Sequence, residues 1–132
     1  LRILAKKYKI PVLMATNLGE KIIIDIERFD VDPKREIFHG LLGKFNLNDF
    51  KNLVSHSPKW IEATRKILNK ELFSEKLMLS LKEVGNTLAG VPQLGITSSV
   101  SSSAVALAIL KIASSQNIKS GRYLIDLDLW KD

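Results

Sequence analysis

The stretch IPVLMATNLGEKIIIDIERFD, residues 10–30, decides the fold because it holds two strand patterns of different kinds around a turn. Residues 12–16, VLMAT, form a short apolar run that is typical of a central parallel strand covered on both faces. Residues 17–20 include Asn and Gly, which tolerate positive φ, and predict a turn. Residues 21–28, KIIIDIER, alternate and predict a strand with one buried face, at an edge or in an antiparallel addition. We therefore expect the chain to leave the middle of a sheet and turn back along its rim.

The alternation divides the second strand into an apolar side with Ile22, Ile24 and Ile26 and an opposite side with Ile23, Asp25 and Glu27. A solvated acidic rim is the favoured interpretation of the carboxylates in and after this strand, at Asp25, Glu27, Asp30 and Asp32. A site for a hard metal ion is the alternative, but the sequence has no recognisable ligand loop, and His39 and His56 fall in expected loops. The sequence therefore assigns no metal ligand and no catalytic residue.

Composition limits the classes of function. The chain has no cysteine, which excludes disulfides, thiolate nucleophiles and cysteine-based zinc sites, and it fits a cytoplasmic protein. A formal net charge of +6 raises the question of nucleic acid, but the lysines are spread along the chain, so we expect no nucleic-acid partner. Residues 84–110 carry no charge, yet they contain Pro92, polar side chains and only a short dense apolar run. We expect this segment to be a loop leading into a buried helix, with no membrane span.

The remaining elements complete an α/β pattern. Helical spacing of apolar residues predicts helices that start near Pro58 and Ser74 and a third over 97–115, and residues 49–56 suit a short helix. Alternation in RYLIDLDLW, residues 122–130, predicts a last strand, with Asp126 and Asp128 at the surface. The expected architecture for residues 1–132 is one partial α/β domain with a mixed sheet and a helical insert at about 45–88.

The helix at 97–115 is apolar nearly all round, so we expect it to pack on more than one side. Its start follows GVPQLG, residues 90–95, which lacks both GxGxxG and GxxxxGK[ST], so close packing is favoured there over phosphate binding. Small side chains allow a second helix to approach closely. The expected interface residues are Ser99, Ser102, Ser103, Ala106 and Ala113.

Two segments carry a family resemblance: residues 10–30 and VPQLGITSSVSSSAVALAILKIASSQNIKSGRYLIDLD, residues 91–128. They resemble the C-terminal half of the ThiF/MoeB/HesA proteins, the bacterial relatives of ubiquitin-activating enzymes. The order of the motifs carries the resemblance: a Pro-led strand, a strand that turns back, a Pro before a small-residue helix, and Ser-Gly-Arg before a last strand. The middle of the chain resembles the helical insert of a branch of this family.

The resemblance implies a Rossmann-like, nucleotide-binding parent: an adenylyltransferase that uses ATP and magnesium, acts on the C-terminal tail of a small carrier protein, and forms two-fold dimers. The family's phosphate loop, its cations for the triphosphate and its metal-binding aspartate all precede the point where this sequence begins. No residue here inherits those roles, so we expect no cofactor for this chain alone.

Two hypotheses remain at this point. The chain is a C-terminal fragment of such an enzyme, contributing a substrate groove and a dimer surface without being catalytic alone. The alternative is a non-catalytic dimerisation or protein-binding module.

Overall fold

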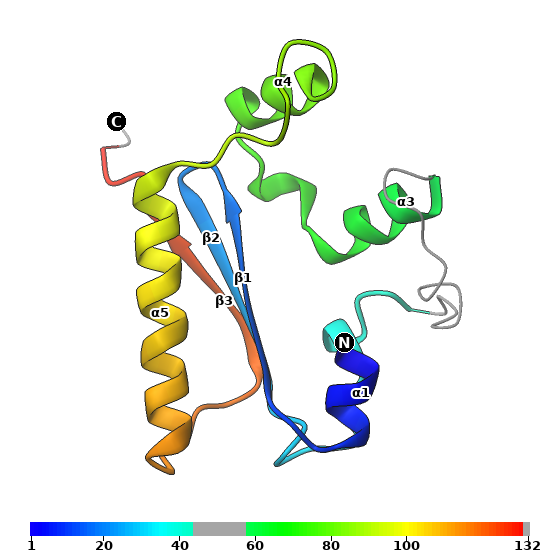
Figure 1. The fold of residues 1–132 in the computed structure, drawn as a ribbon, viewed down its shortest axis with the longest axis vertical. Helices are drawn as coiled ribbons and strands as arrows, with labels where there is room; N and C mark the ends of the chain where they lie inside the picture. The colour runs from blue at the N-terminus through cyan, green and yellow to red at the C-terminus, as the bar shows by residue number, and fades with distance from the viewer. Residues whose placement is uncertain (44–57, 131–132) are drawn as a thin grey trace.

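The computed structural model describes residues 1–43 and 58–130, and the fold is a small sheet with helices on both faces (Figure 1). The strands are β1 (Val12–Leu18), β2 (Lys21–Glu27) and β3 (Gly121–Asp126). The helices are α1 (Arg2–Lys7), α3 (Pro58–Ile67), α4 (Glu75–Glu83) and α5 (Gly95–Ala113), with short turns η1 (Ile37–Gly40) and η2 (Lys70–Leu72). The coarse α/β prediction is thereby confirmed, while the predicted helix at 49–56 lies outside the described residues.

The sheet has the order β1-β2-β3, so β2 is its central strand. Gly19, with a φ of +68°, makes the tight turn between β1 and β2 and places Ala15 opposite Ile24. On the other side β3 pairs with β2, and Tyr123 lies opposite Ile24. Both pairings are antiparallel, so the three described strands contain no parallel pair of the expected mixed sheet.

The first two strands occupy places in the sheet opposite to those predicted. β1 was expected in the middle of the sheet and lies at an edge, whereas β2 was expected to have one exposed face and is buried along almost its full length. An apolar run shows that a strand is covered, but it does not show which strands lie beside it. The alternation of β2 correctly predicted two different faces, but the charged face is buried and not solvated as expected.

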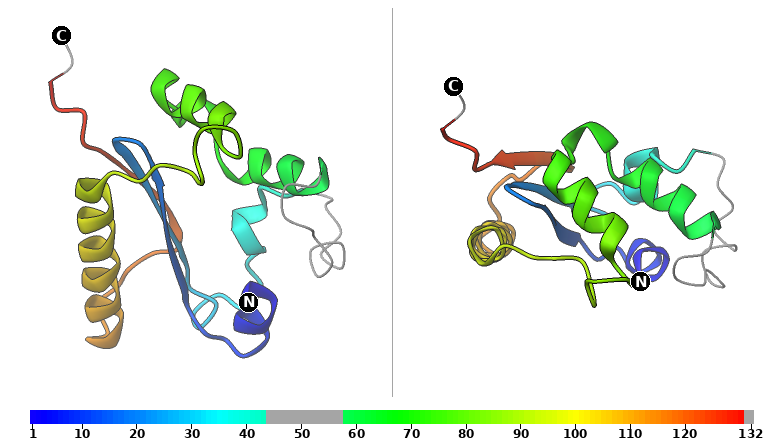
Figure 2. Two further views of the ribbon diagram at one scale, coloured as in Figure 1. Left: turned by 45° about the horizontal axis from the view of Figure 1, so that its top comes forward. Right: turned by 90° about the horizontal axis from the view of Figure 1, so that it is seen from above.

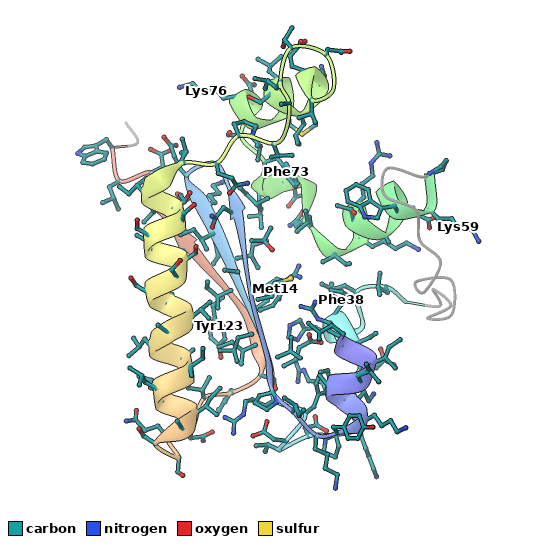
Figure 3. All side chains as sticks on the ribbon, in the orientation of Figure 1. Met14, Phe38, Lys59, Phe73, Lys76 and Tyr123 are labelled. Atoms are coloured by element: carbon teal, nitrogen blue, oxygen red, sulfur yellow. The ribbon has the colours of Figure 1, made fainter. Side chains whose placement is uncertain are left out.

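The helix α5 covers one face of the sheet (Figures 1 and 2). Ile22, Ile24 and Ile26 pack there with Ala108 of α5, and partly buried apolar residues surround this cluster. Figure 3 shows Tyr123 on this side of the sheet and Met14 on the other. Burying a side chain such as isoleucine stabilises by about 1.5–3 kcal/mol, so this cluster is the main apolar core.

The opposite face is divided into two regions. Near the β1–β2 turn it is apolar, because Leu18 and Ile23 pack with Leu77 of α4. The hydroxyl of Ser74 accepts a hydrogen bond from the Leu77 amide at 3.2 Å and caps α4, as the sequence predicted. Farther along β2 the same face is charged and contacts η1 and α1.

The last strand is shorter than predicted, because it ends at Asp126. Asp126 and Asp128 are half-buried rather than fully at the surface, and the Asp128 amide donates to the Asp126 carboxylate at 3.1 Å. Leu129 and Trp130, predicted to continue the alternation, are 73% and 86% exposed.

The outer surface of α5 is apolar and exposed, including Ile96, Leu107 and Leu110. Within the described residues, α5 is the one helix that is long and apolar enough to cross a membrane by length and composition. Core helices of soluble proteins meet the same criterion but are mostly buried, whereas 17% of this apolar window of α5 is buried. The expected buried helix, packed on more than one side, is therefore wrong for the described residues, in which α5 packs on one side, against the sheet.

Candidate functional site

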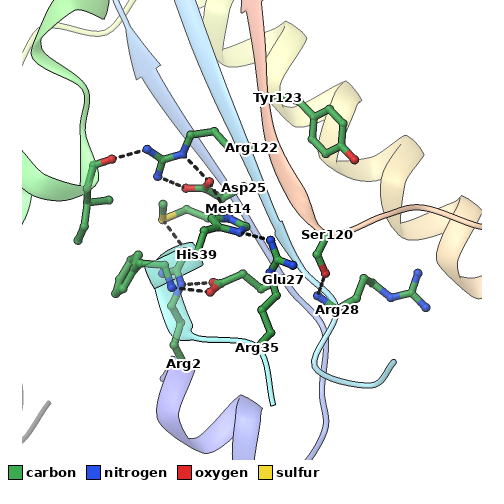
Figure 4. Close-up of polar contacts among 12 residues, drawn as sticks. Arg2, Met14, Asp25, Glu27, Arg28, Arg35, His39, Ser120, Arg122 and Tyr123 are labelled. Atoms are coloured by element: carbon green, nitrogen blue, oxygen red, sulfur yellow. Dashed lines mark hydrogen bonds and ion pairs between the residues drawn. The ribbon is translucent and has the colours of Figure 1, made fainter. Parts of the chain in front are cut away.

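Two carboxylates inside the sheet form the most unusual feature of the molecule. Asp25 and Glu27 lie on the charged face of β2 and are 1% and 0% exposed. A buried carboxylate is costly unless cations and hydrogen-bond donors surround it. Figure 4 shows that side chains from α1, η1 and β3 converge on these two groups.

Asp25 is held chiefly by Arg122 of the neighbouring strand. The guanidinium donates to both carboxylate oxygens, from Nε at 2.8 Å and from Nη2 at 2.9 Å, and its Nη1 donates to the Ile67 carbonyl at the end of α3. The ring of His39 contacts the same carboxylate, with Nε2 at 3.2 Å from Oδ1. Burial alone would raise the pKa of Asp25, but the hydrogen bonds from His39 and Arg122, together with the positive charge of Arg122, lower it to about 2. Asp25 is therefore an ionised carboxylate at neutral pH.

Glu27 is held by the beginning of the chain. Nε of Arg2 forms an ion pair with Oε2 of Glu27, and the Phe38 amide donates to Oε1 at 2.6 Å. The Arg2 guanidinium also lies over the Phe38 ring, 4.0 Å from its centroid, in a cation–π arrangement. These contacts hold both α1 and η1 against the C-terminal end of β2.

The η1 segment adopts an unusual backbone at this contact. Phe38 and His39 have φ values of +52° and +55°, in the left-handed region that side chains other than glycine rarely adopt. Gly40 follows with a φ of +77°, and a Cβ at that position would lie 2.6 Å from Oε2 of Glu36. Such a conformation persists only where its surroundings determine it, and here Glu27 binds the Phe38 amide while Asp25 binds the His39 ring.

The hydrogen bonds of His39 define what the network can do chemically. Nδ1 lies 3.0 Å from Nη2 of Arg35, which can only donate, so this nitrogen is the acceptor. Nε2 therefore carries the proton and donates it to Asp25. Both ring nitrogens are occupied by protein groups, and both oxygens of Asp25 already accept hydrogen bonds from Arg122. We conclude that this network fixes the position of two segments and offers no free general base.

The structure corrects the predicted acidic rim. Asp30 and Asp32 are exposed, as expected for a rim, but Asp25 and Glu27 are buried and paired. The alternative metal site is not assembled either: the described residues contain no group of three or more histidines and carboxylates able to hold an ion. His56 lies outside the described residues. The five expected interface residues, Ser99, Ser102, Ser103, Ala106 and Ala113, are all exposed on α5.

The arginines of this network were not predicted from the sequence. Arg2 and Arg122 are separated from their carboxylates by 25 and 97 positions, and no local pattern connects them. One signal was present. Aspartate and glutamate are depleted in strands, so their occurrence within an isoleucine-rich strand is itself an indication of buried partners elsewhere in the chain.

Comparison with known proteins gives one relative of unknown role. No family model matches the chain, and no solved structure matches it. The chain is 36% identical over 118 residues to a protein of Mycobacterium tuberculosis (strain CDC 1551 / Oshkosh) described as "Uncharacterized protein MT1398". The match covers 89% of this chain but 16% of that relative, so the chain corresponds to a small part of a much longer polypeptide.

Proposed function

We propose that this chain is the distal half of a Rossmann-like domain from a ThiF/MoeB/HesA-like, ATP-dependent adenylyltransferase. It would contribute the substrate groove and a dimer surface, with the C-terminal tail of a small carrier protein as substrate partner. The observation that carries the proposal is the order of elements: a Pro-led strand, a strand that turns back, a helical segment, a small-residue helix and a last strand after Ser-Gly-Arg. The proposed setting is the cytoplasm, without nucleic acid or membrane as partner.

In this proposal, the residues of this chain are not expected to supply a nucleotide site. ATP binding in such a domain needs a glycine-rich loop whose amides hold phosphate, and neither common form of that loop occurs in the sequence. The cations nearest the buried carboxylates are also engaged, Arg122 by Asp25 and Arg2 by Glu27. In the proposed function, ATP and magnesium would bind to an intact parent, and no catalytic residue is assigned here.

Calorimetric titration of the purified chain with ATP and magnesium tests the proposal. We expect no saturable heat up to millimolar ATP. Saturable binding at micromolar ATP would show a nucleotide site within these residues and would overturn the assignment to a distal half.

A non-catalytic dimerisation or protein-binding module is the second candidate, and the exposed apolar surface of α5 favours it. The gene separates the two candidates. An upstream reading frame that encodes GxGxxG supports the adenylyltransferase, and a frame that starts at this segment supports the module.

A further inference from the structure

Arg35 is the one arginine of the charged network that has no carboxylate partner among the described residues. Arg2 and Arg122 each form an ion pair with a buried carboxylate. The Arg35 side chain is half-buried, and its Nε is enclosed without a hydrogen-bond partner. Its Nη2 donates to Nδ1 of His39 at 3.0 Å (Figure 4). The lone pair of a neutral imidazole is therefore the acceptor that holds this cation in place.

A proton on His39 would remove that acceptor. Nδ1 would become a donor that faces another donor, and two cations would lie side by side. The carboxylate of Asp25, 3.2 Å from Nε2, attracts a charged ring. Both of its oxygens already accept hydrogen bonds from Arg122, however, and the charge of that guanidinium offsets the charge of Asp25. The repulsion between a protonated ring and Arg35 is therefore the larger change.

The other charged groups around this ring leave the balance positive. Glu27 is paired with Arg2, and Glu36 is exposed, so water and salt screen its charge. Three arginines thus face two buried carboxylates, and a proton on His39 adds to an existing excess of positive charge. The described charged groups that surround His39 are Asp25 and Glu27 of β2, Arg122 of β3, Arg2 of α1, and Arg35 and Glu36 of its own segment.

The backbone of this segment favours release once the ring contact is lost. Phe38, His39 and Gly40 follow one another with positive φ values, which persist only where surrounding contacts determine them. Among the described residues, β2 supplies two such contacts, from Glu27 to the Phe38 amide and from Asp25 to the His39 ring. Loss of the second contact leaves Phe38 alone to hold the segment against β2.

We propose that residues 35–40 form a pH-dependent latch, closed over the charged face of β2 when His39 is neutral and opened when His39 takes up a proton. Opening brings Arg35 into water and lets the backbone leave the left-handed region. Arg122 keeps Asp25 paired in both states, so the sheet stays folded. Histidine changes its charge between about pH 5 and 8, which sets the working range of the latch. This inference uses only the charged network, so it does not depend on the adenylyltransferase proposal.

Hydrogen exchange of the full chain, followed by NMR at about pH 8 and about pH 5.5, tests the latch. The amides of Phe38 and Leu41 report on it, because they donate to Glu27 and to the Phe38 carbonyl. After correction for the intrinsic effect of pH on exchange, we expect their protection to fall about tenfold at the lower pH, the factor that corresponds to the loss of one hydrogen bond. The amides that pair β2 with its neighbours should keep their protection.

Two variants assign the effect to the His39–Arg35 contact. His39→Gln keeps one donor and one acceptor but takes up no proton, so its protection should not change over this range. Arg35→Met removes the second cation, so its latch should stay closed at the lower pH. Equal protection of the unmodified chain at both pH values would overturn the proposal. A tenfold fall that persists in His39→Gln or in Arg35→Met would assign the opening to other groups and overturn it equally.

Discussion

On one face of β2, three isoleucines pack against α5, and on the other face Asp25 and Glu27 are paired with arginines from the two ends of the chain. Both faces are equally inaccessible to water. The apolar face gains free energy from area removed from water and would tolerate many hydrophobic side chains. The charged face gains less net free energy, because desolvation offsets much of the attraction between the ions.

The difference between the faces assigns them different roles. A shift of one residue in the pairing of β2 would place both carboxylates against α5 and remove their arginines. The apolar face therefore supplies most of the stability, and the charged face makes one register far better than its neighbours. The following predictions test this division, from the largest expected effect to the smallest.

Replacing Arg122 with methionine should cause the largest loss. Methionine replaces the unbranched apolar stem of arginine but has no guanidinium, so Asp25 would keep only the His39 contact while remaining 1% exposed. Removing one partner of a buried ion pair costs about 3–5 kcal/mol. Urea unfolding measures the effect, and Arg65→Met on the exposed side of α3 is the control. A loss of less than about 1 kcal/mol would show that Asp25 is not held as described.

Replacing Ile24 with alanine tests the apolar face. Ile24 is 4% exposed and lies in the cluster with Ala108, so we expect a loss of about 3 kcal/mol, within the usual range for core truncation. The loss should be the same at pH 7 and pH 4, because no ionisable group takes part. Ile109→Ala, at a 51% exposed position, should change the free energy of unfolding by less than about 0.5 kcal/mol.

Lowering the pH should reduce the contribution of the charged face of β2 to the free energy of unfolding and leave that of the apolar face unchanged. The pKa of Asp25 is about 2 in the folded chain and 3.8 ordinarily, so the folded state binds this proton less readily than the unfolded state. Its contribution, on the order of 2 kcal/mol, is complete above about pH 4 and is lost as the pH falls toward 2. Urea unfolding of the unmodified chain and of Asp25→Asn over this range measures it. An equally steep acid loss in Asp25→Asn would assign the effect to other carboxylates.

The Arg28–Asp30 pair extends the comparison to the surface. Their side chains are 2.8 Å apart, and hydrogen bonds from Arg28 lower the pKa of Asp30, but the Asp30 side chain is 29% exposed. We expect Asp30→Asn to cost less than about 1 kcal/mol at pH 7, because water can replace the lost partner. A cost near that of Arg122→Met would mean that exposure does not distinguish the two pairs.

The sequence predicted what depends on neighbouring residues. Gly19 marked the turn, Ser74 marked the start of α4, and the alternation at 22–27 separated the two faces of β2 correctly. It did not predict what depends on distant residues. The partners of Asp25 and Glu27 come from opposite ends of the chain, and the place of β1 at an edge depends on which strands lie beside it. The candidate network was not predicted for the same reason. The sequence of a strand does not identify the distant arginine that pairs with its carboxylate, and without that partner a solvated carboxylate is the expected state.

The separation between Asp25 and Arg122 also has a consequence during protein synthesis. Arg2 has already been made when Glu27 emerges, but Arg122 follows Asp25 by 97 residues. Synthesis proceeds at roughly 5–20 residues per second, so Arg122 is added about 5–20 s after Asp25. During this interval the β1–β2 hairpin has no β3 and no α5 to cover it, and burial of Asp25 would be unfavourable. This segment should therefore remain open until β3 has left the ribosome, and a transcript that ends before the codon for Arg122 should yield a product that chaperones and proteases treat as unfolded.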